Sequence, residues 1–254
     1  LPTSFFVWKY SDSLARFFIE DPSATPLTTD YVSIVFTGLL FSSYSFVFQG
    51  FFTGIEKTKI HMKVTVVSNV LNVYLNAGLI YGSSGVQEFF NEQLSILSFL
   101  SYLWTWANFP ALGVKGAAIG TLISSFWMTA HYAVSLLSKQ TSKRYSVLRF
   151  SFDKEMMKRQ VQLALPQGLQ ESVIALGWGV FYKIVGIIGL VELATTELLF
   201  TIMHASFMPA MGVGQACSTL VSKYMGQGRI KKSETSIRES VRIAEYIMAP
   251  MGLT

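Results

Sequence analysis

The chain has 254 residues, of which 51% are hydrophobic and only 14% are charged, and its formal net charge is +5. Soluble domains carry about 25% charged residues, so this composition does not supply the surface that a soluble fold of this size needs. It favours an all-α polytopic membrane protein. The basic residues lie between apolar runs, which indicates a bilayer rather than nucleic acid as the partner of the positive charge.

Catalytic and metal-binding motifs are missing from the sequence. It contains no CxxC, HExxH, P-loop or GxSxG, and the single cysteine, Cys217, lies in an apolar run. A lone cysteine of this kind is typical of a small packing residue. We therefore expect neither enzyme activity nor a resident metal or organic cofactor.

Long apolar runs predict the membrane-crossing helices, each of which needs about 20 mostly apolar residues. A β-barrel reading fails, because barrel strands are about half as long and alternate in polarity. We expect partial spans at 1–8 and from 243 onward, and we interpret the chain as an internal fragment of a longer protein. The five complete runs are 31–54, 64–82, 116–138, 160–190 and 198–222.

The connections between these runs differ in charge, which predicts a sidedness. Sixteen of the 20 Lys and Arg residues lie in three of them: 57–63, 139–159 and 223–242. The other connections are acidic, with Glu88 and Glu92 in one and Glu192 at the edge of another. Cytoplasmic loops carry an excess of basic residues, so we expect the three basic connections to be cytoplasmic.

One aromatic stretch, 86–106, does not fit as a crossing. It carries two glutamates and no basic residue, and counting it as a span would put two basic connections on opposite sides. We interpret it as an amphipathic helix on the outer membrane interface, with a short re-entrant or extra helix as the alternative. The role of the wider insertion, 83–111, stays open.

The connection 139–159 is the natural boundary between two bundles. We expect 1–138 to form the end of an N-terminal lobe, 139–159 a basic cytoplasmic linker, and 160–254 the start of a C-terminal lobe.

Polar residues inside the spans are the candidates for function, because they are costly in a bilayer. Asn69, Asn72 and Asn76 share one helix face, where they could coordinate a cation or bond to neighbouring helices. Thr121, in the small-residue stretch GVKGAAIGT, is a further candidate ligand, although that stretch also suits close helix packing.

Glu171 and His204 form a second candidate group. At a rise of about 1.5 Å per residue, both fall near the middle of a core about 30 Å thick, on consecutive antiparallel helices. They are candidates for a pair that responds to protons or cations; the alternative is a polar pair that only holds two helices together. Gln167 and Gln170 make this part of the helix polar and are candidate residues of a substrate cavity. Tyr44 and Trp178 are the aromatic candidates for the same cavity.

Two groups of motifs resemble one transporter family. NVLNVYLNAGLIYG (69–82) and FPALGVKGAAIGTLIS (109–124) resemble the fifth and sixth helices of the multidrug and toxic compound extrusion (MATE) transporters. LALPQGLQESV (163–173) and the stretch 186–228 resemble the seventh and eighth helices of that family. The resemblance covers nearly the whole chain, in order.

This resemblance implies a two-lobe bundle of the MATE and flippase type, of which the fragment spans the end of helix three to part of helix nine, without helices one, two and ten to twelve. It implies a monomeric secondary antiporter of a bacterial plasma (inner) membrane that exports organic cations and drugs in exchange for Na⁺ or H⁺. The alternative is a related flippase for lipid-linked sugars. The family's cation site maps to Asn72, Asn76 and Thr121, with Asn76 where several members have Asp. The helix-seven Glu of some members maps to Ile174, three residues after Glu171.

Overall fold

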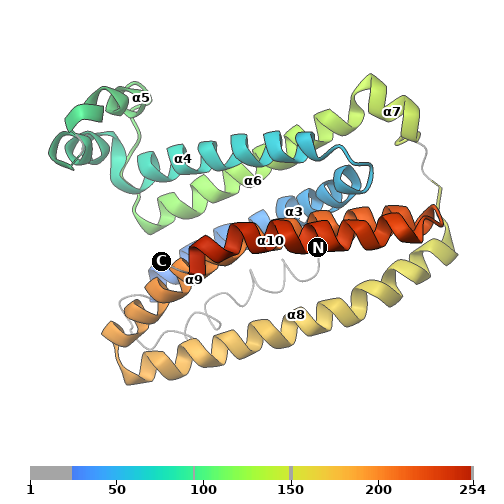
Figure 1. The fold of residues 1–254 in the computed structure, drawn as a ribbon. Helices are drawn as coiled ribbons and strands as arrows, with labels where there is room; N and C mark the ends of the chain where they lie inside the picture. Colours follow the sequence, from blue (N-terminus) through green and yellow to red (C-terminus); the bar gives the residue numbers. More distant parts are fainter. Residues whose placement is uncertain (1–24, 94, 149–150, 253–254) are drawn as a thin grey trace. The chain divides into compact units, whose positions relative to one another are not determined.

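The computed structural model describes residues 25–93, 95–148 and 151–252. All regular structure in these ranges is helical (Figure 1), as the composition predicts. The chain divides into two compact units, Leu1–Phe150 and Ser151–Thr254. The expected partial span at 1–8 lies outside the described residues.

The first unit is built around three long helices. They are α3 (Thr25–Gly54), α4 (Thr58–Gln93) and α6 (Val114–Leu137). The second of these is followed by the 3-10 helix η1 (Ser95–Ser101) and the single turn α5 (Tyr102–Thr105), and the third by α7 (Lys139–Tyr145). α6 packs against both other long helices, which have little contact with each other.

The second unit contains α8 (Lys154–Ile188), α9 (Leu190–Gly226) and α10 (Ile230–Gly252). α9 and α10 lie side by side, whereas α8 meets α9 over a much smaller area (Figure 1). α8 and α9 are separated by Gly189 alone. α10 begins at Ile230, so the charged stretch before the expected apolar segment is also helical.

Four described helices are long and apolar enough to cross a membrane: α3 from Tyr31, α4, α8 and α9. The fifth expected span, α6, forms a helix of 24 residues over almost the expected range but is not one of these four. It carries Lys115 and His131 together with many small and hydroxyl residues. Those small residues serve the packing of α6 against its neighbours.

The contact between α4 and α6 leaves no room for a side chain at two glycines of α6. A Cβ atom on Gly116 would collide with the backbone carbonyl of Leu79, and one on Gly120 would collide with the amide oxygen of Asn76. Ser124, one turn further along, is also buried. Small residues four apart allow helix backbones to approach closely, which is a common way for helices to associate in lipid.

A kink at Gly82 changes the direction of α4. Gly82 has φ 72° and ψ 168°, a conformation that a residue with a side chain adopts only with strain. Beside the kink, the carbonyls of Leu79 and Ile80 accept hydrogen bonds from the N–H groups of Leu112 (2.8 Å) and Gly113 (3.2 Å). The kink therefore joins α4 to the turn that leads into α6.

The single helix expected over 86–106 is wrong in form. The structure divides this segment between the end of α4, η1 and α5. Hydrogen bonds of Trp104 and Leu103 with Tyr74 hold the end of the segment back against α4, which one continuous helix over 86–106 could not do.

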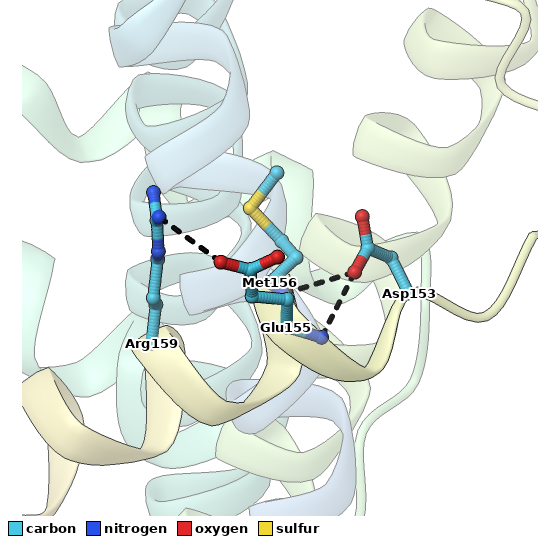
Figure 2. A network of polar contacts seen from close by, with 4 residues as sticks. All are labelled: Asp153, Glu155, Met156 and Arg159. Carbon is cyan, nitrogen blue, oxygen red and sulfur yellow. Dashed lines mark hydrogen bonds and ion pairs between the residues drawn. The ribbon is translucent and has the colours of Figure 1, made fainter.

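The expected linker 139–159 is also largely helical, because it contains α7 and the first residues of α8. Asp153 sets the start of α8: its carboxylate accepts hydrogen bonds from the N–H groups of Glu155 (2.9 Å) and Met156 (3.1 Å), as Figure 2 shows. Aspartate is a preferred helix N-cap for this reason. The neighbouring Arg159–Glu155 ion pair (3.3 Å) is exposed and adds little to stability.

Replacing Gly116 by alanine tests the close contact between α4 and α6. We expect Gly116→Ala to lower the stability of the full-length protein by about 1–3 kcal/mol, because the added methyl group meets backbone that cannot rotate away. The measurement is thermal unfolding of the purified protein in detergent. Gly50→Ala in α3 is the control, since a Cβ at that position would meet no atom within 4 Å. Equal unfolding temperatures for the two variants would contradict the packing argument.

Candidate functional site

The first predicted group lies where α4 contacts α6. The Nδ2 of Asn76 donates a hydrogen bond to the Oδ1 of Asn72, one turn earlier, over 3.1 Å. Thr121 follows Gly120 on the facing helix, and its hydroxyl donates to the carbonyl of Ala117 in its own helix (2.9 Å). The structure thus pairs the two asparagines, whereas no hydrogen bond joins Thr121 to either of them among the described residues.

The Oδ1 atom of Asn76 is buried and accepts no hydrogen bond within the part of the chain that the structure describes. It lies against Gly120 of α6. A buried carbonyl oxygen without a donor is costly, and such an oxygen can be satisfied by water, by a proton donor or by a hard cation. The third asparagine of the predicted stripe, Asn69, is exposed and takes no part in this pair.

The second predicted group, Glu171 and His204, belongs to the second unit. Both side chains are exposed, and no ion pair or hydrogen bond joins them in the described part of α8 and α9. The predicted pair is therefore not formed as a direct contact. Glu171 and His204 still lie near the sides on which α8 and α9 meet, and the neighbouring aromatic residues identify those sides.

An aromatic cluster holds α8 and α9 together near their junction. Phe200 of α9 lies with its ring centroid 4.8 Å from that of Trp178, 5.7 Å from that of Phe181 and 6.3 Å from that of Tyr182. These contacts identify the sides on which the two helices meet. Val185, the buried residue of α8, lies one turn closer to the junction.

Helical geometry places both ionisable candidates on these facing sides. Since each residue turns the helix by about 100°, Glu171 points within about 20° of Trp178, and His204 points within about 40° of Phe200. Both groups therefore lie near the sides on which the helices meet, further along the chain from the junction than the aromatic cluster, and both are exposed.

The predicted substrate-cavity residues are distributed over both units. Tyr44 lies on α3 and is 55% exposed, whereas Gln167, Gln170 and Trp178 lie on α8 and are exposed as well. A hollow of 470 Å³ runs along a different face of α8 from the one that carries the two glutamines. It is lined by Val161, Ala164, Leu165, Gly168, Leu169 and Ser172.

Sequence reasoning missed a polar cluster at the basic end of the first unit. The Nδ1 of His61 lies 2.5 Å from the hydroxyl of Tyr132 and 3.3 Å from that of Thr65. Tyr132 is only 1% exposed, and its ring lies nearly parallel to the rings of His61 and Phe52, at 6.3 and 5.9 Å between centroids. These residues belong to three different helices, and no motif in the sequence connects them.

The same end of the unit holds α7 in place. The ammonium group of Lys57 donates to the hydroxyl of Thr141 (3.2 Å), which is 2% exposed. The ring of Phe51 meets that of Tyr145 edge-on at 5.6 Å. The first basic connection is therefore bonded to the start of the second. The Lys57–Thr141 and Phe51–Tyr145 contacts fix the direction in which α7 leaves α6.

Comparison with known proteins decides the family. The family model described as MatE matches residues 1–77 and 174–254, which is more than half of the chain. The chain belongs to the MatE family. The predicted resemblance to the MATE transporters is confirmed, and so is the expectation that the protein is not an enzyme, since this family consists of transporters.

Curated relatives of this MatE-family chain carry the names of multidrug resistance proteins. It is 26% identical over 227 residues to the probable multidrug resistance protein NorM of Thermotoga maritima, and 24% identical over 226 residues to that of Agrobacterium fabrum. Each alignment covers 88% of this chain and 43% of the relative. The probable multidrug resistance protein YoeA of Bacillus subtilis is 22% identical over 218 residues, which are 85% of this chain and 42% of the relative.

The chain thus spans less than half the length of these relatives. No solved structure gives a significant match. Within the MatE-family chain, Asn72, Asn76, His204 and Trp178 fall inside the ranges that the family model matches, whereas Thr121 and Glu171 fall outside them. With its apolar helices, the family assignment makes this an integral membrane protein.

Replacing Tyr132 by phenylalanine tests the His61 cluster. The change removes the hydroxyl next to His61 and keeps the ring that stacks on Phe52, so we expect a loss of about 0.5–1.5 kcal/mol in unfolding free energy. Tyr145→Phe is the matched control, because the Tyr145 hydroxyl makes no hydrogen bond within the described residues while its ring contacts Phe51. Thermal unfolding of both variants measures the difference. An equal loss of stability in the two variants would show that the Tyr132–His61 hydrogen bond does not contribute to stability.

Proposed function

We propose that the full-length protein is a secondary antiporter that exports organic cations and drugs in exchange for Na⁺ or H⁺. The observation that carries this proposal is the family assignment, together with relatives named as multidrug resistance proteins along 85–88% of the chain. The relatives are bacterial, so the membrane is a bacterial plasma (inner) membrane. The basic connections then face the cytoplasm, as the charge bias of membrane proteins requires.

Transport proceeds by alternating access between two lobes, of which the two compact units are parts. The coupling cation and the drug favour states that open to opposite sides, and each shifts the equilibrium only by its difference in affinity for the two states. Pro166 lies inside α8 and Pro209 inside α9, where Gly212 and Gly214 follow it. A proline removes a backbone hydrogen bond from a helix, so these positions suit a helix that bends between states.

Two groups are candidates for binding the coupling cation. The Asn72–Asn76 pair offers a neutral site with a buried amide oxygen, and Thr121 adds a hydroxyl on the facing helix. Glu171 and His204 offer a titratable site between α8 and α9. The ring of Tyr44 in the first unit and that of Trp178 in the second are each candidates for contact with an organic cation, because aromatic faces attract positive charge. The amides of Gln167 and Gln170 are further candidates on α8.

Efflux of a fluorescent organic cation tests the proposed function. Cells that express the full-length gene should export the dye faster than cells without it. Dissipating one of the two gradients, that of sodium or that of protons, should abolish this difference, whereas dissipating the other should not. The gradient that matters identifies the coupling ion. Export that persists after both gradients have collapsed would contradict secondary antiport.

Replacing Glu171 by glutamine tests the titratable site. The change keeps the size of the side chain and removes its charge, so we expect gradient-dependent efflux to fall by at least about fivefold, the lower end of usual coupling energies. Glu155→Gln is the matched control: it makes the same chemical change on the same helix, at an exposed ion pair with Arg159. If both variants transport like the unchanged protein, Glu171 plays no part in coupling.

A further inference from the structure

The segment from residue 83 to 108, which we name the aromatic segment, is not explained by transport. It comprises the end of α4 beyond the Gly82 kink, then η1, α5 and the residues just after α5. It lies within 78–173, the range that the family model leaves unmatched. Its sequence has no basic residue and is rich in Phe, Tyr and Trp.

Hydrogen bonds fix the inner side of this segment to α4. The indole Nε1 of Trp104 donates to the carbonyl of Tyr74 (2.8 Å), and the hydroxyl of Tyr74 donates in return to the carbonyl of Leu103 (2.8 Å). The hydroxyl of Ser83 donates to the carbonyl of Trp104 and accepts from the N–H of Phe109, both over 2.7 Å. The segment is therefore a docked element with a defined position.

Ring contacts strengthen the same attachment. Trp104 packs between Tyr74, at 5.2 Å between centroids, and Phe90, at 5.8 Å, while Phe109 meets Tyr74 edge-on at 5.6 Å. A Cβ on Gly78 would strike the ring of Phe109, so α4 is shaped to receive that ring. These aromatic residues therefore pack against one another within the first unit.

Five other large residues of the segment are exposed. Trp106 is 86% exposed, Tyr102 77% and Phe99 68%; Phe89 and Leu103 are more than half exposed. Exposed apolar area of this extent in one short element marks a surface that binds something. Its composition is that of the aromatic belts of membrane proteins, where Trp and Tyr lie at the level of the lipid headgroups.

The length of α4 puts the segment at that level. The uncharged part of α4, 64–82, rises about 27 Å at about 1.5 Å per residue, which nearly matches a hydrocarbon core of about 30 Å. Lys63 marks one boundary of this part and the Gly82 kink the other. Exposed Val66, Val70 and Val73 form a lipid-facing surface on α4 that leads toward the aromatic segment.

We propose that the aromatic segment is a lipid-binding element: Phe99, Tyr102 and Trp106 insert into the interfacial layer of the bilayer at the end of α4 remote from Lys57. Trp104 and Ser83 hold it against α4, so that lipid contact fixes the depth of α4 and α6. The carboxylates of Glu88 and Glu92 stay in water. The partner is the phospholipid interface itself.

Spin labels measure the depth directly. Phe99→Cys, Tyr102→Cys and Trp106→Cys are made one at a time in full-length protein whose other cysteines, Cys217 included, are serine, and the protein is reconstituted in vesicles of phosphatidylethanolamine and phosphatidylglycerol. Power saturation with oxygen and with a water-soluble nickel chelate gives the depth of each label. We expect depths of about 5–10 Å below the headgroup boundary.

Two further labels calibrate the result. Glu92→Cys, on an exposed polar position of the same segment, should give the values of water, and Val70→Cys, 65% exposed near the middle of α4, should give those of the hydrocarbon core. The proposal would be overturned if the labels at positions 99, 102 and 106 were as accessible to the nickel chelate as the label at position 92. Labels shielded from both reagents would also overturn it, since a second copy or another protein would then cover the surface. Depth is measured without transport, so a failure here leaves the proposed antiport untouched.

Discussion

The contact between α4 and α6 is the constraint on which the first unit depends. In lipid, apolar surface gains nothing by leaving the solvent, so helices associate through close packing and hydrogen bonds between them. Gly116 and Gly120 allow the two backbones to approach until the Leu79 carbonyl and the Asn76 amide touch α6. This approach buries the Asn76 oxygen and brings Leu112 within bonding distance of α4. The buried amide oxygen and the hydrogen bonds beside the kink both belong to this contact region.

The second unit is organised differently, because ring contacts rather than glycines join α8 to α9. Phe200 meets three aromatic residues of α8 close to Gly189, and beyond this cluster α8 has almost no buried residue. Glutamate and glutamine side chains on such a helix must find water or polar partners, since lipid satisfies none of their hydrogen bonds. Glu171 on α8 and His204 on α9 are both exposed, and the direct contact predicted between them is not formed.

The sequence predicts the helices well and their ends poorly. Charge-free runs of about 20 residues locate the long helices, because the bilayer imposes that length. Where a helix begins or bends depends on single residues: Asp153 starts α8 before the apolar run does, and Gly82 turns α4 at the end of one. Spacing alone also brings Asn72 and Asn76 together, since they lie one turn apart. The His61–Tyr132 bond joins residues 71 positions apart, and such a contact exists only once α4 and α6 have packed.

The two candidate cation sites differ in chemistry, and this difference separates their possible roles. The amides of Asn72 and Asn76 do not titrate, so this pair can respond to a metal cation but cannot release a proton. Of the predicted cation ligands, Glu171 and His204 alone have ionisable side chains. Within the proposed antiport, Glu171 and His204 are therefore the candidates for proton coupling, whereas the amide oxygen buried between α4 and α6 is the candidate for sodium coupling. Among these candidate ligands, proton coupling points to the second unit and sodium coupling to the first.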